Sequence, residues 1–472
     1  MSDCCIAGSA ASDYDLAVLG AGGAGFSAAI TAAEAGARVA LIGQGTIGGT
    51  CVNIGCVPSK TMIRAADALH AARAAARFDG LASEARLVEW RRLLAAKDAL
   101  VASLRQKKYV ELLSDNDRIS YLEGPARLTD GGVTIAGRLI RAQKVVIATG
   151  ARPGMPSIPG LSEVPILTST SLLELEELPE SLIVVGGGFI GTELAQMMAR
   201  MGTRVTIVCR SRLLPQAEPE ISAALAQIFG HEGIRVRCAA AYDACRRTTR
   251  GVLLRLADCE EVEADRVLIA AGRSPNIEHL GLPDAGVVQD ARGYISVDDR
   301  MRTSRKNIYA AGDVTGKDQF VYMAAYGGKI AAKNALSGDT EAYSNDAMPW
   351  IVFTDPQVAG VGLTEAQANA AGYQVKTSLI GLDHIPRALA ARDTRGLIKL
   401  VAEVGSGRLL GGQILAPEGA DSIQTLVLAL KHGMTSKDLA DTIFPYLTTV
   451  EGVRLAAQGF ERDPLELPCC AG

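Results

Sequence analysis

Residues 48–60 read GGTCVNIGCVPSK, in which four residues separate Cys51 from Cys56. A glycine pair precedes the two cysteines, and the apolar spacing after Pro58 predicts a helix. A cysteine at a helix N-terminus lies at the positive end of the helix dipole, which lowers its thiol pKa below the free value of about 8.5. Two such thiols can alternate between dithiol and disulfide and transfer two electrons. The segment therefore predicts a redox-active pair; a structural disulfide or two buried thiols are the alternatives.

The residues before this loop have the order of a dinucleotide-binding fold. Residues 14–19 predict a buried strand, GAGGAG at 20–25 a glycine turn, and the alanine-rich residues that follow a helix. In that order a pyrophosphate binds at the helix N-terminus. The next strand, at 38–42, should end in an acidic residue that binds a ribose, but the chain has Gly43 and Gln44 there. We expect Gln44 or a backbone group to make that contact.

A second glycine turn, GGGFIG at 186–191, follows a predicted strand at 182–185 and precedes a predicted helix. After the next strand, at 204–208, come Arg210 and Arg212, where an NAD site would have an acidic residue. Guanidinium groups suit a 2′-phosphate, so we expect NADPH as the nicotinamide cofactor. Two solvated surface charges are the alternative for these arginines.

Each glycine turn is followed by a similar apolar strand that closes its fold, at residues 144–150 and 266–273. This repeat predicts two dinucleotide folds in tandem. The residues from 64 to 113 follow a helical pattern. From residue 348 on, alternating stretches predict an antiparallel sheet flanked by helices, and the end at 465–472 predicts a mobile tail.

The composition is that of an ordinary globular protein: 472 residues, 48% hydrophobic, 21% charged, with a formal net charge of -4. Such a charge gives no basic surface for nucleic acid. No apolar run reaches the roughly 18 residues of a membrane span, and the N-terminus has no pattern of a secretory signal. We therefore expect a cytoplasmic protein, and its ten cysteines are too few for a disulfide scaffold.

Together these segments resemble the flavoprotein disulfide reductase family over nearly the whole chain. The shared features are both glycine turns, the Cys51/Cys56 loop, the Ala-Thr-Gly segment ending at Gly150 and the Ala-Gly-Asp segment ending at Asp313. The resemblance implies FAD and NADPH as cofactors, and a homodimer in which the interface domain of each subunit completes the active site of the other. It also implies that Cys56 interacts with the flavin and that Cys51 meets the substrate.

The resemblance also transfers individual roles to this chain. Lys60 and Glu193 match an ion pair beside the flavin ring, and Phe189 matches an aromatic residue that shields the ring until the nicotinamide enters. The implied cofactor contacts are Gly20, Gly22, Gly25, Gly45, Thr50, Ala126, Thr149, Gly150, Asp313 and Val321 for FAD, and Gly186, Gly188, Gly191, Arg210 and Arg212 for NADPH.

We therefore predict an α/β protein with two tandem Rossmann-like domains and an α+β C-terminal dimerisation domain. The predicted segments are a disordered leader at 1–13, an FAD-binding domain at 14–155, an NADPH-binding domain at 156–278, a central domain completing the FAD site at 279–346, and an interface domain with its tail at 347–472.

One departure from the family concerns proton transfer. Typical members carry a His-Pro pair with a glutamate five positions after the histidine, whereas the matching positions here are Tyr446, Leu447 and Glu451. Splitting an organic disulfide requires an acid with a pKa near neutral pH, and the pKa of a tyrosine is about 10. The substrate should therefore need thiolates and electrons rather than a proton donor.

The adjacent Cys469 and Cys470 give a second indication, because thiolates are ligands for soft metal ions. Two thiols on a mobile arm can pass an ion to a second pair at high effective concentration. With Tyr446 and Tyr109, these cysteines make the chain similar to the Hg(II)-reducing group of the family. That resemblance implies that Hg(II) arrives as a thiol complex, moves from Cys469/Cys470 to Cys51/Cys56 of the partner chain, and is reduced to Hg(0).

Other interpretations remain. An NADPH-dependent disulfide reductase of the thioredoxin or glutathione reductase type would share the fold, and a protein that sequesters metal by thiols would share the cysteines. Cys4 and Cys5 are either a second metal-collecting pair or part of a disordered leader. The remaining cysteines, Cys209, Cys238, Cys245 and Cys259, are predicted to be structural or incidental.

Overall fold

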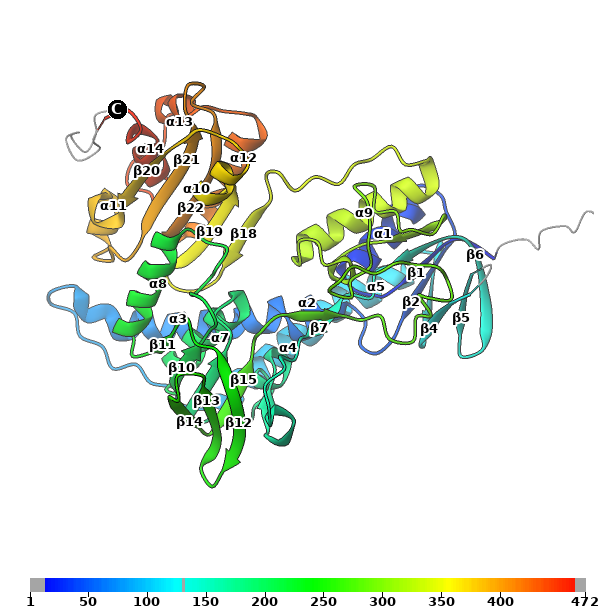
Figure 1. The fold of residues 1–472 in the computed structure, drawn as a ribbon, viewed down its shortest axis with the longest axis horizontal. Helices are drawn as coiled ribbons and strands as arrows, with labels where there is room; N and C mark the ends of the chain where they lie inside the picture. The colour runs from blue at the N-terminus through cyan, green and yellow to red at the C-terminus, as the bar shows by residue number, and fades with distance from the viewer. Residues whose placement is uncertain (1–12, 130–131, 463–472) are drawn as a thin grey trace, which may run out of the picture. The chain divides into compact units, whose positions relative to one another are not determined.

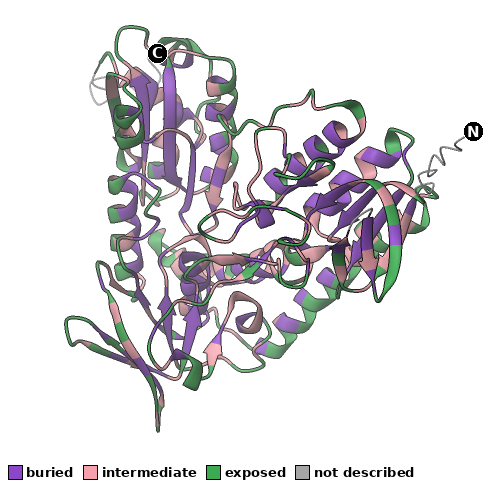
Figure 2. Cartoon of the chain, turned by 45° about the vertical axis from the view of Figure 1, so that its right-hand side comes forward, coloured by how far each residue is buried: buried purple, intermediate pink, exposed green. Residues whose placement is uncertain are grey.

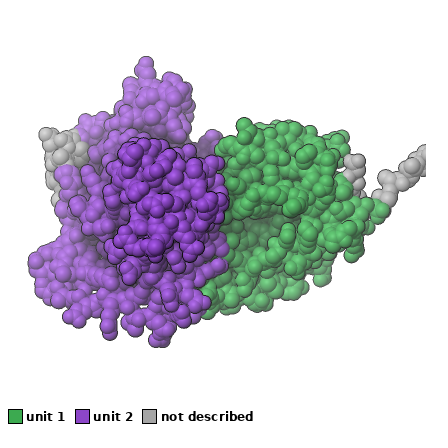
Figure 3. All heavy atoms as spheres, turned by 60° about the horizontal axis from the view of Figure 1, so that its bottom comes forward, with its two compact units in different colours: residues 1–58, 96–153, 273–344 green, residues 59–95, 154–272, 345–472 purple. Residues whose placement is uncertain are grey.

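A computed structural model describes residues 13–129 and 132–462 (Figure 1). Its chain divides into two compact units, each assembled from segments far apart in the sequence (Figure 3). Unit 1 comprises residues 1–58, 96–153 and 273–344, and unit 2 comprises residues 59–95, 154–272 and 345–472. Within the described residues, no helix is long and apolar enough to cross a membrane.

Unit 1 is built on a sheet in which β1, the strand before the first glycine turn, lies at the centre beside β6. The strand order is β3-β2-β1-β6-β5-β4, and β17 pairs with β6. The pairs β1·β2, β2·β3, β1·β6 and β6·β17 are parallel, and β4·β5 and β5·β6 are antiparallel. The strands are β1 (Tyr14–Leu19), β2 (Val39–Gly43), β3 (Ile119–Glu123), β4 (Ala126–Thr129), β5 (Gly132–Ile135), β6 (Arg138–Ile147) and β17 (Ile308–Ala310). A two-stranded sheet joins β7 (Ala151–Pro153) to β16 (Arg273–Pro275).

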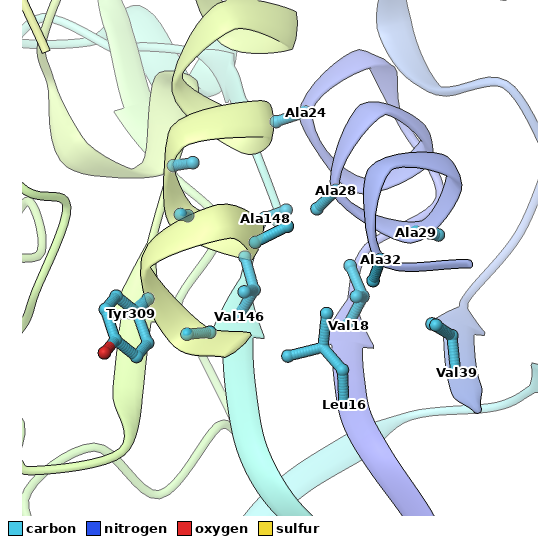
Figure 4. Packing of buried hydrophobic residues seen from close by; sticks show 14 of the residues in the cluster. Leu16, Val18, Ala24, Ala28, Ala29, Ala32, Val39, Val146, Ala148 and Tyr309 are labelled. Carbon is cyan, nitrogen blue, oxygen red and sulfur yellow. The ribbon is translucent and has the colours of Figure 1, made fainter. Parts of the chain in front are cut away.

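Two helices of unit 1, α1 (Gly23–Glu34) and α9 (Val321–Ser337), pack side by side (Figure 1). Their close approach depends on small residues: a Cβ on Gly328 would lie 2.2 Å from the carbonyl oxygen of Ala24. Figure 4 shows alanines of α1 above the valines of β1 and β6 in one buried cluster. The core of this domain therefore uses alanine where helices meet and branched side chains on the sheet.

The helical region between β2 and β3 is divided into several helices. The observed elements are α2 (Gly49–Ile54), α3 (Cys56–Arg73), a 3-10 turn (Ala74–Arg77), α4 (Trp90–Arg105), a π-helical segment (Gln106–Val110) and α5 (Glu111–Ser114). The predicted helical pattern at 64–113 is found on both sides of an interruption, because residues 78–89 form no helix. Gly80, with φ +87°, breaks the helical backbone there.

The part of unit 2 that holds the second glycine turn repeats the parallel arrangement, with the strand order β11-β10-β9-β15-β8. These strands are β8 (Ile166–Leu167), β9 (Ser181–Val185), β10 (Arg204–Val208), β11 (Arg235–Arg237) and β15 (Arg266–Ile269), with the helices α6 (Ser169–Leu172), α7 (Phe189–Arg200) and α8 (Pro219–His231). A small antiparallel sheet adds β12 (Tyr242–Thr248), β13 (Gly251–Leu256) and β14 (Glu261–Ala264). The prediction of two dinucleotide folds in tandem is confirmed.

The C-terminal part of unit 2 is the predicted antiparallel sheet, with the order β18-β19-β22-β21-β20. Its strands are β18 (Pro349–Val352), β19 (Gln357–Gly362), β20 (Val375–Gly381), β21 (Leu397–Glu403) and β22 (Leu409–Ala416), and its helices are α10 (Glu365–Ala370), α11 (Pro386–Ala390), α12 (Gly419–Lys431), α13 (Ser436–Asp441) and α14 (Glu451–Gln458). The sequence did not indicate β20, an edge strand whose side chains are mostly exposed or half-buried. The inner strands of the sheets are buried (Figure 2), as expected for α/β and α+β domains.

Candidate active site

The first glycine turn has the geometry of an anion-binding turn. Gly20 has φ +117°, and a Cβ there would lie 2.2 Å from the Ala148 carbonyl oxygen; a Cβ on Gly25 would lie 1.7 Å from the Gly20 carbonyl oxygen. The N-cap of α1 is Gly22, which caps the helix with no side chain, and the first turn holds no acidic residue. The first backbone N–H groups of α1 are thus open to a pyrophosphate, so the turn fits FAD.

Two further predicted FAD residues lie at this turn. Val321 begins α9, and its Cγ2 would be 3.1 Å from a Cβ on Gly23. Asp313 begins a 3-10 turn (Asp313–Thr315), and its carboxylate pairs with Arg273 at 3.2 Å from Nε to Oδ2. Burial raises the pKa of Asp313, while the Arg273 guanidinium opposes that rise. A carboxylate held in this way can accept a hydrogen bond from a ligand hydroxyl.

The remaining predicted FAD residues lie on backbone turns or at strand ends. Gly45 and Gly150 adopt positive φ, at +78° and +71°. The Thr149 hydroxyl donates to the Asn276 carbonyl oxygen at 2.6 Å, and the Asn276 side chain donates back to Thr149 at 3.0 Å. Ala126 begins β4, and Thr50 is exposed in α2. Thr149 and Asn276 therefore fix each other.

The cysteine loop is seated directly on the first glycine turn. Gly48 and Gly49 both have positive φ, at +96° and +68°, and a Cβ on Gly49 would lie 2.5 Å from the Cα of Gly22. Cys51 lies within α2, and Cys56 is the first residue of α3; both side chains are half-buried. The prediction that a cysteine of this pair lies at a helix N-terminus is confirmed for Cys56.

Asn53, between the two cysteines, holds the loop together. Its side-chain nitrogen donates to the carbonyl oxygens of Ile47 and Gly49, both at 2.8 Å, and its oxygen accepts from Arg105 Nη1 at 3.1 Å. Neither Asn53 nor Arg105 is among the predicted site residues. The available signal was an amide side chain placed between two cysteines, where it can bind the backbone of a tight loop.

Tyr109 lies beside the cysteine pair, in the π-helical segment at Gln106–Val110. Its ring meets Phe26 edge-on, with centroids 4.9 Å apart, and its Cδ2 would be 3.1 Å from a Cβ on Gly48. Burial raises the pKa of Tyr109, and the charges of Cys51 and Cys56 add to that rise. Cys51, Cys56 and Tyr109, all predicted site residues, are therefore brought together.

The second glycine turn repeats the geometry of the first. Gly186 has φ +119°, and a Cβ on Gly191 would lie 2.1 Å from the Gly186 carbonyl oxygen. Gly188 caps α7 without a side chain, and a Cβ there would meet no atom within 4 Å. This open backbone at a helix N-terminus fits the phosphates of NADPH.

The two arginines expected at the NADPH 2′-phosphate differ in their surroundings. Arg210 is exposed, whereas Arg212 donates from Nη2 to the carbonyl oxygens of Pro215 and Ala217, at 3.0 and 2.6 Å. In the described part of the chain, the buried Nε of Arg212 has no hydrogen-bond partner. Arg210 is the better placed of the two to meet a ligand, because Arg212 is bound to its own loop.

Two cysteines that are predicted to be structural or incidental lie together beside this turn. The Sγ atoms of Cys209 and Cys238 are 3.6 Å apart, and the Sγ of Cys209 would be 3.1 Å from a Cβ on Gly187. Burial raises the pKa of Cys209 to about 12, with Cys238 as the next cause. The register of β10 and β11 explains the pairing, since Val208 and Arg237 are neighbours and a cysteine follows each.

Lys60, Glu193 and Phe189 belong to a polar and aromatic cluster of unit 2. Lys60 Nζ is 2.6 Å from Glu193 Oε2 and lies 5.0 Å from the centroid of the Phe353 ring. Glu193 is buried, and its other oxygen accepts from the Phe353 backbone N–H at 2.9 Å. Phe189 stacks on Trp350, with centroids 5.6 Å apart. The ion pair forms as expected, and its role beside the flavin stays a prediction.

Tyr446 and Glu451 lie in the C-terminal part of unit 2. The Tyr446 side chain is 54% exposed, whereas Glu451, the first residue of α14, is 4% exposed and accepts from the Leu447 backbone N–H at 3.3 Å. The predicted thiol pairs Cys4/Cys5 and Cys469/Cys470 lie outside the described residues.

Comparison with known proteins identifies the class to which this fold and site belong. Residues 14–328 match the family of pyridine nucleotide-disulphide oxidoreductases, and residues 348–457 match the dimerisation domain of that family. The chain belongs to this family, and it is an oxidoreductase that uses FAD and NADPH, as predicted.

The relatives narrow the class further. A mercuric reductase from Streptomyces lividans is 44% identical over 97% of this chain and 98% of its own length. A mercuric reductase from Shigella flexneri is 47% identical over 97% of this chain and 82% of its own length. Among solved structures, the Cu(II) complex of the HOCl-induced flavoprotein disulfide reductase RclA from Escherichia coli superposes with a TM-score of 0.85 at 30% identity, covering 95% of this chain and 99% of that one. The predicted resemblance to the mercury-reducing group is confirmed.

Proposed function

We propose that this protein reduces thiol-bound Hg(II) to Hg(0) at the expense of NADPH and thereby detoxifies mercury. The balance is NADPH + Hg(II) → NADP+ + H+ + Hg(0), with two electrons passing from the nicotinamide to the metal ion. Bound NADPH and FAD supply and relay these electrons. The protein supplies the thiolates that bind the ion and the binding site that holds it near the flavin.

The observation that carries the proposal is the cluster of Cys51, Cys56 and Tyr109. Two thiols at one loop can hold a soft cation between them, and the phenol of Tyr109 is packed against that loop. The mercuric reductases of S. lividans and S. flexneri align with this chain over nearly its whole length, which supports the same substrate.

The surroundings of Glu451 argue against disulfide cleavage. In disulfide cleavage a carboxylate orients a histidine that acts as the acid. Here the Glu451 carboxylate accepts a hydrogen bond from the Leu447 backbone N–H, and Tyr446 occupies the position that matches the histidine. The five histidines of the chain are His70, His231, His279, His384 and His432, all before this segment. We therefore assign Tyr446 a role as a metal-contacting phenol and no role as a general acid.

The delivery of mercury completes the proposal. Cys469 and Cys470 would take Hg(II) from outside thiols and pass it to Cys51 and Cys56 of the second subunit of a homodimer. Each exchange replaces two Hg–S bonds by two others and moves two protons between thiols, so it requires no oxidant. The match to a dimerisation domain supports the homodimer.

The test is NADPH oxidation by the purified holoprotein with Hg(II) in excess thiol, run beside oxidised glutathione and lipoamide as acceptors. We expect NADPH oxidation and release of mercury vapour with Hg(II) alone. Faster turnover of either disulfide would assign the protein to the disulfide reductases. Stoichiometric Hg(II) binding without NADPH oxidation would make it a sequestering protein.

A further inference from the structure

The end of strand β2 lacks the acidic side chain that this fold uses to bind the adenosine ribose. The strand ends at Gly43, whose backbone does not have a positive φ, so conformation alone does not require glycine there. A side chain at this position would instead have to displace the phenol of Tyr121. A Cβ on Gly43 would lie 2.5 Å from the Tyr121 hydroxyl oxygen, 2.9 Å from Tyr121 Cε2 and 3.0 Å from the Cβ of Ala21.

The register of the sheet explains why Tyr121 reaches this point. Strands β2 and β3 are parallel, with Leu41 opposite Tyr121 and Gly43 opposite Glu123. Residues opposite each other in a parallel pair point to the same face. The phenol of Tyr121 therefore extends along that face and fills the space that a side chain at position 43 would occupy.

The hydroxyl of Tyr121 is available to a ligand. The side chain is half-buried, and within the described residues its hydroxyl makes no hydrogen bond to the protein. Burial raises the pKa of Tyr121, and the charge of Glu123 adds to that rise, so the phenol stays protonated near neutral pH. A neutral phenol both donates and accepts, and it lies next to Ala21 of the glycine turn that fits the FAD pyrophosphate.

We propose that Tyr121 replaces the missing strand-end acid and hydrogen-bonds a ribose hydroxyl of the adenosine half of FAD. This assigns the contact to a neighbouring strand rather than to Gln44, which is exposed at the start of the following loop. The inference concerns FAD binding alone, so its failure would leave the proposed Hg(II) reduction standing.

The test compares FAD with its 2′-deoxyadenosine and 3′-deoxyadenosine analogues, titrated into flavin-free protein and followed by flavin fluorescence. We expect Tyr121→Phe to weaken FAD binding about two- to tenfold, the range of one neutral hydrogen bond. Against one of the deoxy analogues, Tyr121→Phe should bind as tightly as the unchanged protein. Tyr14→Phe, in the same sheet, is the matched control and should bind all three ligands normally.

An equal loss for FAD and both deoxy analogues, or no loss at all, would overturn the proposal. Parallel variants separate the other candidates: an analogue-specific loss in Gln44→Ala or Glu123→Gln alone would assign the contact to that residue instead. A second measurement tests the space argument. The single variant Gly43→Glu should bind FAD more weakly than the unchanged protein. The double variant Gly43→Glu/Tyr121→Ala should bind FAD more tightly than the single variant Tyr121→Ala.

Discussion

The two glycine turns of this chain are nearly the same in backbone and differ in the cysteines beside them. At the first turn, Cys51 and Cys56 lie on a loop with a helix N-terminus and are half-buried. At the second, Cys209 lies at the end of a buried strand, is 4% exposed, and touches Cys238. The reactivity of a thiol therefore follows from its environment, because a helix dipole favours the thiolate and burial disfavours it.

The largest contrast should appear when one cysteine of each pair is removed. Cys56→Ala should reduce Hg(II) turnover by about ten-thousandfold or more, as expected for loss of a group that acts directly on the substrate. Cys238→Ala should keep its turnover, because that pair takes no part in the chemistry. NADPH oxidation with Hg(II) in excess thiol measures both, and the flavin absorbance checks that Cys56→Ala still holds FAD. Full activity of Cys56→Ala would contradict the mechanism.

Alkylation of the folded protein sharpens the same contrast. Burial raises the pKa of Cys209 to about 12 from an ordinary value of 9.0, so at pH 8 its thiolate fraction is about a thousandfold below that of an ordinary thiol. The thiol therefore becomes reactive only as the pH rises toward 12. With iodoacetamide and peptide mass spectrometry, Cys209 should stay unlabelled while the exposed Cys259 reacts. Equal labelling of both at pH 8 would refute the environment assigned to Cys209.

A methyl group at the equivalent glycine of each turn should weaken the binding of one cofactor and leave the binding of the other unchanged. In Gly191→Ala the new Cβ would lie 2.1 Å from the Gly186 carbonyl oxygen, and the distortion, at about 1–3 kcal/mol, should weaken NADPH binding about five- to hundredfold. FAD binding should remain. Gly25→Ala, with a distance of 1.7 Å, should lose FAD instead.

Titration of each cofactor measures these effects, and Gly230→Ala serves as the control. A Cβ on Gly230 meets no atom within 4 Å, so that variant should bind both cofactors normally. If Gly191→Ala lost FAD as well as NADPH, the two turns would not be independent sites.

The smallest effect concerns the two arginines after β10. Arg210→Gln should lower the preference for NADPH over NADH about tenfold, the loss of one charge-assisted hydrogen bond to a phosphate. Arg212→Gln should mainly lower the melting temperature, because it removes the donors to Pro215 and Ala217. Measuring the binding of NADPH and NADH and the thermal unfolding of each variant tests this assignment of roles to the two arginines. A larger loss of preference in Arg212→Gln would reverse the two roles.

Much of the fold follows from local patterns in the sequence. Each strand, glycine turn and helix occupies one short segment of sequence, and so the prediction placed both dinucleotide folds. It also placed a helix after Pro58, although α3 in fact begins two residues earlier, at Cys56. The interruption at residues 78–89 was missed because the alanine-rich residues before it, up to Ala76, have a helical pattern that the prediction extended past Gly80. The edge strand β20 was missed because an edge strand buries less of one face and so shows weaker alternation.

The amino-acid sequence by itself determined the two glycine turns, the cysteine loop and the tyrosine at position 446, since each is a property of neighbouring residues. Only the tertiary structure decided which distant residues meet: Tyr109 with the cysteine loop, Cys209 with Cys238, and Tyr121 with Gly43. The physical reason is strand register and helix packing, which bring together positions that no local spacing relates.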